Sequence, residues 1–161
     1  MTKLIATNSF RWPGGLLGPD DPNAVQIEGT KQSRYVIICD HGGNRVPERL
    51  GTLGLPTHEL SRHIGWDIGA LGTARKLAAL LDGTLIHQPY SRLVIDCNRP
   101  PHVAEAFPHR SDGTEVPGNI NIAPGEAAAR VAEIFLPYHN AITATLDARK
   151  GQDTLLMAVH T

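Results

Sequence analysis

The 161-residue sequence has only two cysteines, Cys39 and Cys97, which are too few for a disulfide-stapled scaffold. Each lies in an apolar run, so we expect two buried free thiols. No stretch approaches the ~20 consecutive apolar residues that a membrane span requires. Residues 1–8 lack the long apolar core of a secretory signal peptide. Together these absences predict a cytoplasmic protein.

The sequence also lacks a surplus of charge of either sign. The formal net charge is −1 and no cluster of Lys and Arg stands out, which argues against nucleic acid or an anionic membrane as a partner. Apolar residues make up 41% and charged residues 19%, which is typical of an ordinary globular chain and excludes wholesale disorder. We expect a single domain over residues 1–161 with a core of its own.

Short apolar runs alternate with helical patterns along the chain. Residues 1–33 are rich in Gly, Pro, Asp and Asn and predict an irregular segment. Runs rich in apolar and β-branched residues predict four strands, at Tyr35–Cys39, Thr84–His87, Arg92–Cys97 and Thr154–Val159. Strands separated by helices indicate an α/β sandwich with a largely parallel sheet.

Two segments have helical periodicity. The first runs from a cap at Thr57 to Leu81, although three glycines within it each cost ~1 kcal/mol relative to Ala or mark a kink. The second runs from Gly125 to about Lys150 and should be kinked by Pro137. Between strands and helices, residues 98–124 form a long polar connection, and loops of that length are commonly functional.

Polar clusters directly follow three of the predicted strands. They are Asp40–Asn44, Asp96–Arg99 and His160–Thr161. The carboxyl ends of parallel strands meet at one edge of a sheet, where ligands bind in open α/β folds. Topology therefore predicts that these three clusters converge on one site.

The first cluster combines a histidine with a flexible turn. Gly42 and Gly43 let the backbone turn sharply after His41, and neutral imidazole is a common metal ligand that the adjacent Asp40 could orient. The alternative is a Gly-Gly turn in which Asp40 and His41 only satisfy backbone groups. The glycine spacing matches neither dinucleotide-binding nor Walker loops, so phosphate binding is a weaker hypothesis.

The second cluster places arginines on both sides of an apolar run. Arg99 could grip a substrate carboxylate with two hydrogen bonds, and Asn98 could donate another. For Asp96 we favour a structural ion pair with Arg99. Arg92 precedes the same run.

A third pattern is His63 and Asp67, four residues apart, which a helix would place on one face. That spacing suits metal ligation or a His–carboxylate pair, but for His63 a structural role is favoured. The remaining histidines lack a partner at a telling spacing and are interpreted as surface or structural: His58, His87, His102, His109 and His139.

Taken together, these clusters resemble the N-formylglutamate amidohydrolase family. The resemblance runs in order from Val36 to the C-terminus, through DHGGNRVP (40–47), RHIGWDIGA (62–70), YSRLVIDCNRP (90–100), SDGTEVPGN (111–119), LPYH (136–139) and MAVHT (157–161). The family is similar in fold to the zinc carboxypeptidases, which implies a three-layer α/β/α sandwich with a largely parallel or mixed sheet. It also implies hydrolysis of an amide on an acidic amino acid.

The resemblance implies a zinc ion held by His41, Asn44 and His160, with the substrate carboxylate gripped by Asn98 and Arg99. The carboxypeptidase motif has Glu at the position of Asn44, and Asn is a poor zinc ligand by comparison. Either Asp40 or Asp67 is therefore an alternative second ligand.

For catalysis, Arg92 could neutralise charge on the developing oxyanion and Asp67 could shuttle the proton. The wider group continues beyond the final histidine motif and carries its general-base Glu there. We therefore expect the C-terminal part of the family fold to be absent from this chain.

The expected function is zinc-dependent hydrolysis of a linear amide, such as N-formylglutamate to formate and glutamate. The alternative is a truncated or non-catalytic relative that binds a small carboxylate without turnover. The expected partner is a small acidic N-acyl amino acid, and a homo-oligomer is left open.

Overall fold

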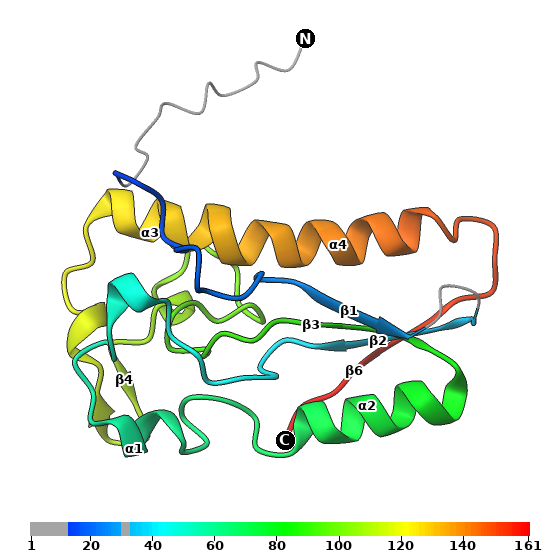
Figure 1. The fold of residues 1–161 in the computed structure, drawn as a ribbon, viewed down its shortest axis with the longest axis horizontal. Helices are drawn as coiled ribbons and strands as arrows, with labels where there is room; N and C mark the ends of the chain where they lie inside the picture. Colours follow the sequence, from blue (N-terminus) through cyan, green and yellow to red (C-terminus); the bar gives the residue numbers. More distant parts are fainter. Residues whose placement is uncertain (1–12, 30–32) are drawn as a thin grey trace, which may run out of the picture.

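The centre of the molecule is a four-stranded mixed sheet in the order β1-β3-β2-β6 (Figure 1). The computed structural model describes residues 13–29 and 33–161. Strand β2 (Tyr35–Cys39) runs parallel to both β3 (Thr84–His87) and β6 (Leu155–Ala158), whereas β1 (Gln26–Gly29) is antiparallel to β3. The predicted α/β architecture with a mixed sheet is confirmed.

Helices cover both faces of the sheet and complete three layers. Helix α2 (Ala70–Leu81) lies on one face. The other face carries a long helix made of α3 (Pro124–Arg130), the π-helical turn η4 (Val131–Phe135) and α4 (Leu136–Asp147). In the described part of the chain, no helix is long and apolar enough to cross a membrane.

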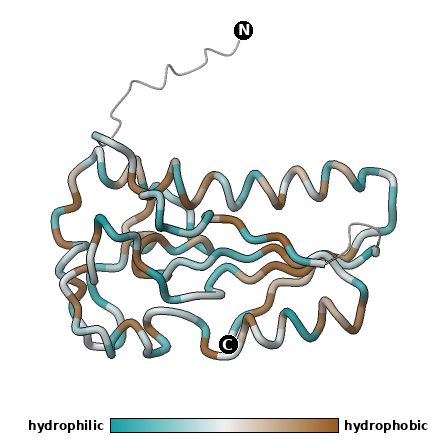
Figure 2. The backbone as a smooth tube through the Cα atoms, in the orientation of Figure 1, coloured by the Kyte–Doolittle hydropathy of each residue, from teal (hydrophilic) through white to brown (hydrophobic). Residues whose placement is uncertain are grey.

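The alternation of side chains along the strands divides the core in two. Val36 and Ile86 point to the side of Tyr138 and Ile142, and form part of the larger core cluster. The neighbouring residues on the same two strands, Ile37 and Leu85, face α2 instead. They pack with the buried alanines of that helix, Ala70, Ala74 and Ala78. Figure 2 shows the hydrophobic strands enclosed between the two helical layers.

The strand predicted at Arg92–Cys97 is wrong, because these residues form buried turns. Leu93, Val94 and Ile95 are fully buried, and side chains bind the carbonyls of Leu93 and Val94 in place of a neighbouring strand. Asn119 Nδ2 donates to the Leu93 carbonyl at 2.7 Å, and Arg130 Nη1 donates to the Val94 carbonyl at 2.9 Å. An apolar run indicates that a segment is buried, but burial alone does not distinguish a strand from a turn.

The continuous helix predicted from Thr57 to Leu81 is also wrong. It is divided into a single turn, α1 (Thr57–Leu60), and α2, with turns between them. A Cβ at Gly65 would lie 2.4 Å from the Leu60 carbonyl oxygen, and Gly69 adopts a left-handed φ of 86°. These glycines mark the break, which frees Asp67 from a helix face.

The second predicted helix is confirmed in outline but ends at Asp147, short of Lys150. The π-helical turn ends two residues before Pro137, and a proline inside a helix removes a backbone donor and clashes with the preceding turn. The long connection after residue 98 contains a small hairpin of β4 (Arg110–Ser111) and β5 (Thr114–Glu115). Short 3₁₀ turns complete the irregular regions: η1 (Glu48–Leu50), η2 (Ala104–Ala106) and η3 (Pro117–Asn119).

Strand β1 lies within the segment predicted to be irregular. Its Glu28 receives a bidentate contact from Arg75 of α2, with the Nη2–Oε1 distance 2.7 Å, and lies 2.9 Å from His87 Nε2 of β3. The hydrogen bond from Arg75 is the main reason that the pKa of Glu28 falls to about 2. Burial lowers the pKa of His87, so its ring favours the neutral form. Glu28 thus fastens an edge strand to the sheet and to α2.

We predict that Glu28→Gln lowers the free energy of unfolding by ~0.5 kcal/mol at pH 7, a small value because the ion pair is partly exposed to solvent. A carboxylate whose pKa is depressed stabilises the fold above its unfolded pKa, and this contribution is lost between about pH 4.5 and 2. Urea denaturation across pH 2–7 should show the two proteins converging at the acid end. Glu115→Gln is the matched surface control, and a difference between wild type and Glu28→Gln that is independent of pH would contradict this account.

Candidate functional site

His41 lies two residues after the end of β2, at the carboxyl edge of the sheet, and is almost fully buried. The glycines that follow it permit a close approach between two loops. A Cβ on Gly43 would lie 2.2 Å from the Pro89 carbonyl oxygen. The same carbonyl accepts the Arg45 amide at 3.2 Å, which holds the loop after His41 against residues 89–91. The predicted glycine turn therefore positions the imidazole.

Asp67 comes from the turn between α1 and α2 and is bound to the same place through its backbone. Its amide donates to the His41 carbonyl at 3.1 Å, and its own carbonyl accepts the first amide of α2. Gly65, two residues earlier, accepts both the Arg92 amide at 3.1 Å and the Ser91 hydroxyl at 2.7 Å. This interrupted helix, which the sequence pattern did not show, brings Asp67 beside His41.

His160 reaches the site because β6 is parallel to β2. Ala158 is in register with Ile38, and the Val159 amide donates to the Ile38 carbonyl at 2.9 Å. The chain then places His160 next to His41, with ring centroids 5.3 Å apart. The predicted convergence of the ends of these two strands is confirmed.

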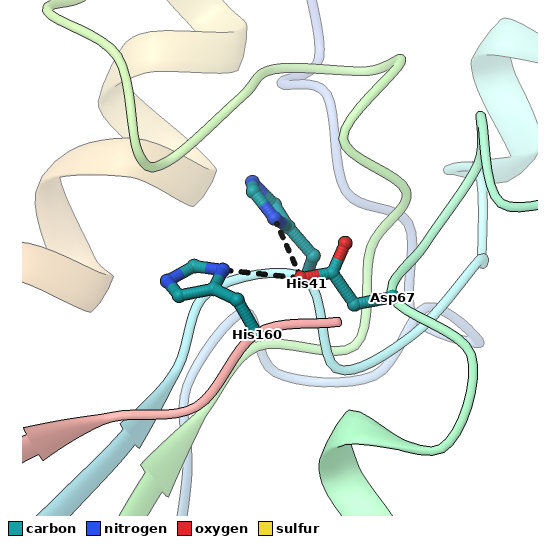
Figure 3. Close-up of side chains that lie close together, drawn as sticks. All are labelled: His41, Asp67 and His160. Atoms are coloured by element: carbon teal, nitrogen blue, oxygen red, sulfur yellow. Dashed lines mark hydrogen bonds and ion pairs between the residues drawn. The ribbon is translucent and has the colours of Figure 1, made fainter.

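The three side chains present their donor atoms to one another (Figure 3). Asp67 Oδ2 lies 3.4 Å from His41 Nδ1 and 3.1 Å from His160 Nδ1. One donor atom from each residue falls within 4.8 Å of the others, as candidate ligands of a single metal ion must. Two imidazoles and one carboxylate are also a ligand set that zinc favours.

Both imidazoles direct their other nitrogen at a second carboxylate. His41 Nε2 lies 2.7 Å from Asp96 Oδ1, and His160 Nε2 lies 3.4 Å from Asp40 Oδ2. Carboxylates only accept hydrogen bonds, and a neutral ring has a single N–H for the two carboxylates that flank it, so one nitrogen of each ring faces a carboxylate with its lone pair. With Nε2–H directed at the outer carboxylates, the two Nδ1 lone pairs would face the anionic oxygen of Asp67. A cation between them relieves that repulsion, so the residues present fit a bound metal ion.

Further groups hold the outer carboxylates in place. Buried Tyr138 of α4 donates its hydroxyl to Asp40 Oδ1 at 2.6 Å. Burial, with Asp40 nearby, raises the pKa of Tyr138, which keeps the hydroxyl protonated as a donor. His160 is thereby connected through Asp40 to the long helix.

Asp96 is held by three donors. Its carboxylate binds His41 Nε2 at 2.7 Å, Arg92 Nη2 at 2.9 Å and the backbone amide of Asn98 at 2.9 Å. Burial alone would raise the pKa of Asp96, but the hydrogen bond from His41, together with Arg92 and the backbone amide of Asn98, lowers it to about 2. Asp96 is therefore a firm anion next to His41. The ion pair that we predicted between Asp96 and Arg99 is absent from the described residues, where Arg92 takes that place.

Arg92 bridges the two buried carboxylates. Its Nη1 donates to Asp67 Oδ1 at 3.2 Å while Nη2 binds Asp96. Its side chain is 30% exposed and also lines a cavity of about 380 Å³ next to the cluster. Arg92 can thus both orient the acidic groups and face a bound molecule.

The other predicted residues lie around this cluster. Asn44 donates its side-chain amide to the Leu60 carbonyl at 3.1 Å. Asn98 and Arg99 are exposed, and Arg99 lines the cavity. His63 is exposed and pairs with Asp112 at 3.3 Å.

Of the remaining histidines, His109 lines the cavity, whereas His58, His139 and both thiols have surface or structural surroundings. His139 lies 2.9 Å from the Cys97 carbonyl and His58 pairs with Glu59. Cys39 and Cys97 are buried free thiols, as predicted. Burial raises the pKa of Cys39 to about 12, so it stays a neutral thiol beside the site.

A model of the N-formylglutamate amidohydrolase family matches residues 33–161. The chain belongs to this family. Membership supports an amidohydrolase-like function in general.

A solved structure, the crystal structure of gene product Atu2144 from Agrobacterium tumefaciens, is similar to the chain with a TM-score of 0.86 and 33% sequence identity. The alignment covers 90% of this chain and 59% of that protein, so the chain spans less than two thirds of the length of this relative. No curated protein matches the chain.

Tyr138 is the residue of the site that the sequence interpretation missed, although a signal was present. It shares the inward face of the long helix with Ile134 and Ile142. A tyrosine on such a face must find a partner for its hydroxyl. That requirement predicts a buried acceptor but does not say which one.

We predict that Gly43→Ala destabilises the protein by about 1–3 kcal/mol, because the added Cβ would collide with the Pro89 carbonyl. Gly72→Ala is the matched control, since Gly72 lies in α2 with open space at the Cβ position. That change should stabilise the helix by about 0.5–1 kcal/mol. Urea denaturation measures both, and a Gly43→Ala variant as stable as wild type would refute the close approach.

Proposed function

We propose that this protein is a zinc-dependent amidohydrolase that cleaves the amide of an N-acylated acidic amino acid, with N-formylglutamate as the representative substrate. The coarse activity rests on family membership. Metal dependence rests on one observation: two imidazole Nδ1 atoms and Asp67 Oδ2 converge, while the opposite ring nitrogens face Asp40 and Asp96.

In this proposal, His41, Asp67 and His160 hold the metal. We assign Asp67 in place of Asn44 as the second ligand because its Oδ2 lies beside the Nδ1 atoms of both imidazoles, while its Oδ1 contacts the guanidinium of Arg92. Its Oδ1 accepts from Arg92, and its Oδ2 also accepts the Thr161 amide at 3.3 Å. A carboxylate engaged in this way suits ligation, so we no longer assign the proton shuttle to Asp67. Asp96 and Asp40 orient the two imidazoles.

The reaction adds the oxygen of water to the carbonyl carbon of the acyl group and breaks its bond to nitrogen. From N-formylglutamate it releases formate and glutamate. A bound zinc ion would polarise that carbonyl and lower the pKa of water towards ~7. Arg92 lies at the boundary of the cluster and the cavity, where its guanidinium can stabilise negative charge on the carbonyl oxygen.

Asn98 and Arg99 provide the proposed carboxylate grip. Both are exposed at the turn after Asp96. The backbone amide of Asn98 donates to Asp96 Oδ1 at 2.9 Å, which leaves its side chain available to a ligand. Arg99 faces the cavity that adjoins the cluster. A bidentate guanidinium–carboxylate contact there would orient the amide towards the ligands.

We predict that the full chain binds about one zinc ion per molecule and releases formate from N-formylglutamate. His41→Ala and His160→Ala should each remove most of the zinc and the activity, whereas the exposed His102→Ala should retain both. Zinc content by mass spectrometry and an enzymatic formate assay measure the two properties. Full activity of His41→Ala would exclude the metal role of this cluster.

The same experiment distinguishes the alternative, a relative that binds small carboxylates without turnover. If calorimetry shows that N-formylglutamate binds but the zinc-loaded wild type releases no formate, the amidohydrolase hypothesis is rejected and the binding protein is supported. Activity without any bound metal would instead retain the reaction and reject its zinc dependence.

We predict that Asp96→Asn weakens zinc binding by ~10–100-fold, because an amide supports the His41 ring less strongly than a carboxylate. The exposed Asp20→Asn is the control and should bind zinc as wild type does. Titration against a chromophoric chelator gives both affinities without relying on turnover. Unchanged affinity in Asp96→Asn would mean that its contact with His41 serves the fold alone.

A further inference from the structure

The cavity beside the cluster has more cationic groups than the proposed function uses. Its volume of about 380 Å³ suits a small-molecule ligand. Three arginines line it, Arg92, Arg99 and Arg110, together with two carboxylates, Asp96 and Glu105. Arg92 and Asp96 already pair with each other. Apart from that pair, the charged side chains of the lining are two arginines, Arg99 and Arg110, and one exposed glutamate, Glu105.

Arg99 and Arg110 come from separate segments and share a feature that Arg92 lacks. Across residues 13–29 and 33–161, neither of their side chains has a hydrogen bond or ion pair within the protein. Arg99 follows the turn at Asp96, whereas Arg110 begins strand β4 of the small hairpin. An unpaired guanidinium that lines a pocket is available to an anionic ligand.

The hairpin that carries Arg110 is firmly attached to the rest of the site. Asp112 and Gly113 form its turn with positive φ values of 42° and 78°, as a tight two-residue hairpin requires. Arg62 donates to Asp112 Oδ2 at 2.8 Å and to the Thr114 hydroxyl at 2.9 Å. His63 Nε2 lies 3.3 Å from the same Asp112 carboxylate.

These contacts connect the hairpin to the segment that leads into Asp67. Arg62 and His63 precede Asp67 in the turn between α1 and α2, and Arg62 also binds Glu59 of α1 at 2.6 Å. Arg110 is therefore presented by an anchored strand at a defined place relative to the cluster. Preorganisation of this kind lets a charged contact contribute to selectivity.

We propose that Arg110 forms a second anion subsite, so that the cavity selects ligands with two carboxylates. Arg99 grips one carboxylate, as in the proposed function on which this inference rests, and Arg110 binds the carboxylate at the other end of the molecule. In an N-acylated amino acid, that second group is the side-chain carboxylate. Arg110 is then the residue that distinguishes an acidic from a neutral side chain.

The test compares Arg110→Gln with wild type on N-formylglutamate and on its neutral isostere, N-formylglutamine. We expect kcat/KM for N-formylglutamate to fall by ~10–100-fold, mainly through KM, since a charge-assisted hydrogen bond is lost. For N-formylglutamine the change should stay below ~3-fold, because that substrate has no charge for Arg110 to bind. Arg34→Gln, an exposed arginine at the opposite end of β2, is the matched control and should leave both substrates unchanged.

A binding measurement separates failure of this subsite from failure of the amidohydrolase. Calorimetry of the full chain with glutarate and with its monoamide requires neither metal nor turnover. Arg110→Gln should weaken the binding of glutarate by ~10-fold or more and leave the affinity for the monoamide unchanged. Absence of formate release from both substrates would reject the amidohydrolase while the glutarate result still decides the subsite. Equal losses on the charged and neutral ligands, or no loss on either, would overturn the subsite.

Discussion

The site depends on the shared carboxylate of Asp67. A buried carboxylate is costly unless several donors or a cation satisfy it. Here the groups around it come from segments far apart in the sequence: His41 after β2, Arg92 in a buried turn and His160 after β6. The turns and strands that carry these groups must be in place together before the carboxylate is satisfied. Folding and site assembly are for that reason the same event at this edge of the sheet.

A second layer of contacts gives the cluster its orientation. Asp96 and Asp40 each fix one imidazole, and they are fixed in turn by Arg92 and by Tyr138. Ring rotation would break a contact on each side, so the Nδ1 atoms are held facing Asp67. The same Arg92 and Asp96 also line the neighbouring cavity. In the proposed function, these two side chains would therefore take part both in orienting the metal ligands and in contacting the bound molecule.

The parts of the fold that were predictable are those in which local pattern and burial agree. The runs at β2, β3 and β6 are short, apolar and followed by polar residues, and their parallel pairing confirmed that His41 and His160 lie at one edge. The run at 92–97 is equally apolar, yet buried side chains such as Asn119 and Arg130 satisfy its carbonyls. Such side chains replace a strand only after distant segments have packed, so no local pattern reports them.

Sequence by itself determined the residue types of the site and the sheet edge at which two of them meet. Which side chain lies with the two histidines was left open among Asn44, Asp40 and Asp67, because the helical pattern hid the break around Gly65 and Gly69. The tertiary structure brings Asp67 beside both of them: the Asp67 amide binds the His41 carbonyl at 3.1 Å, and that contact turns the carboxylate towards both rings. The physical reason is that periodicity reports burial along one segment, whereas hydrogen bonds between segments depend on how loops pack against one another.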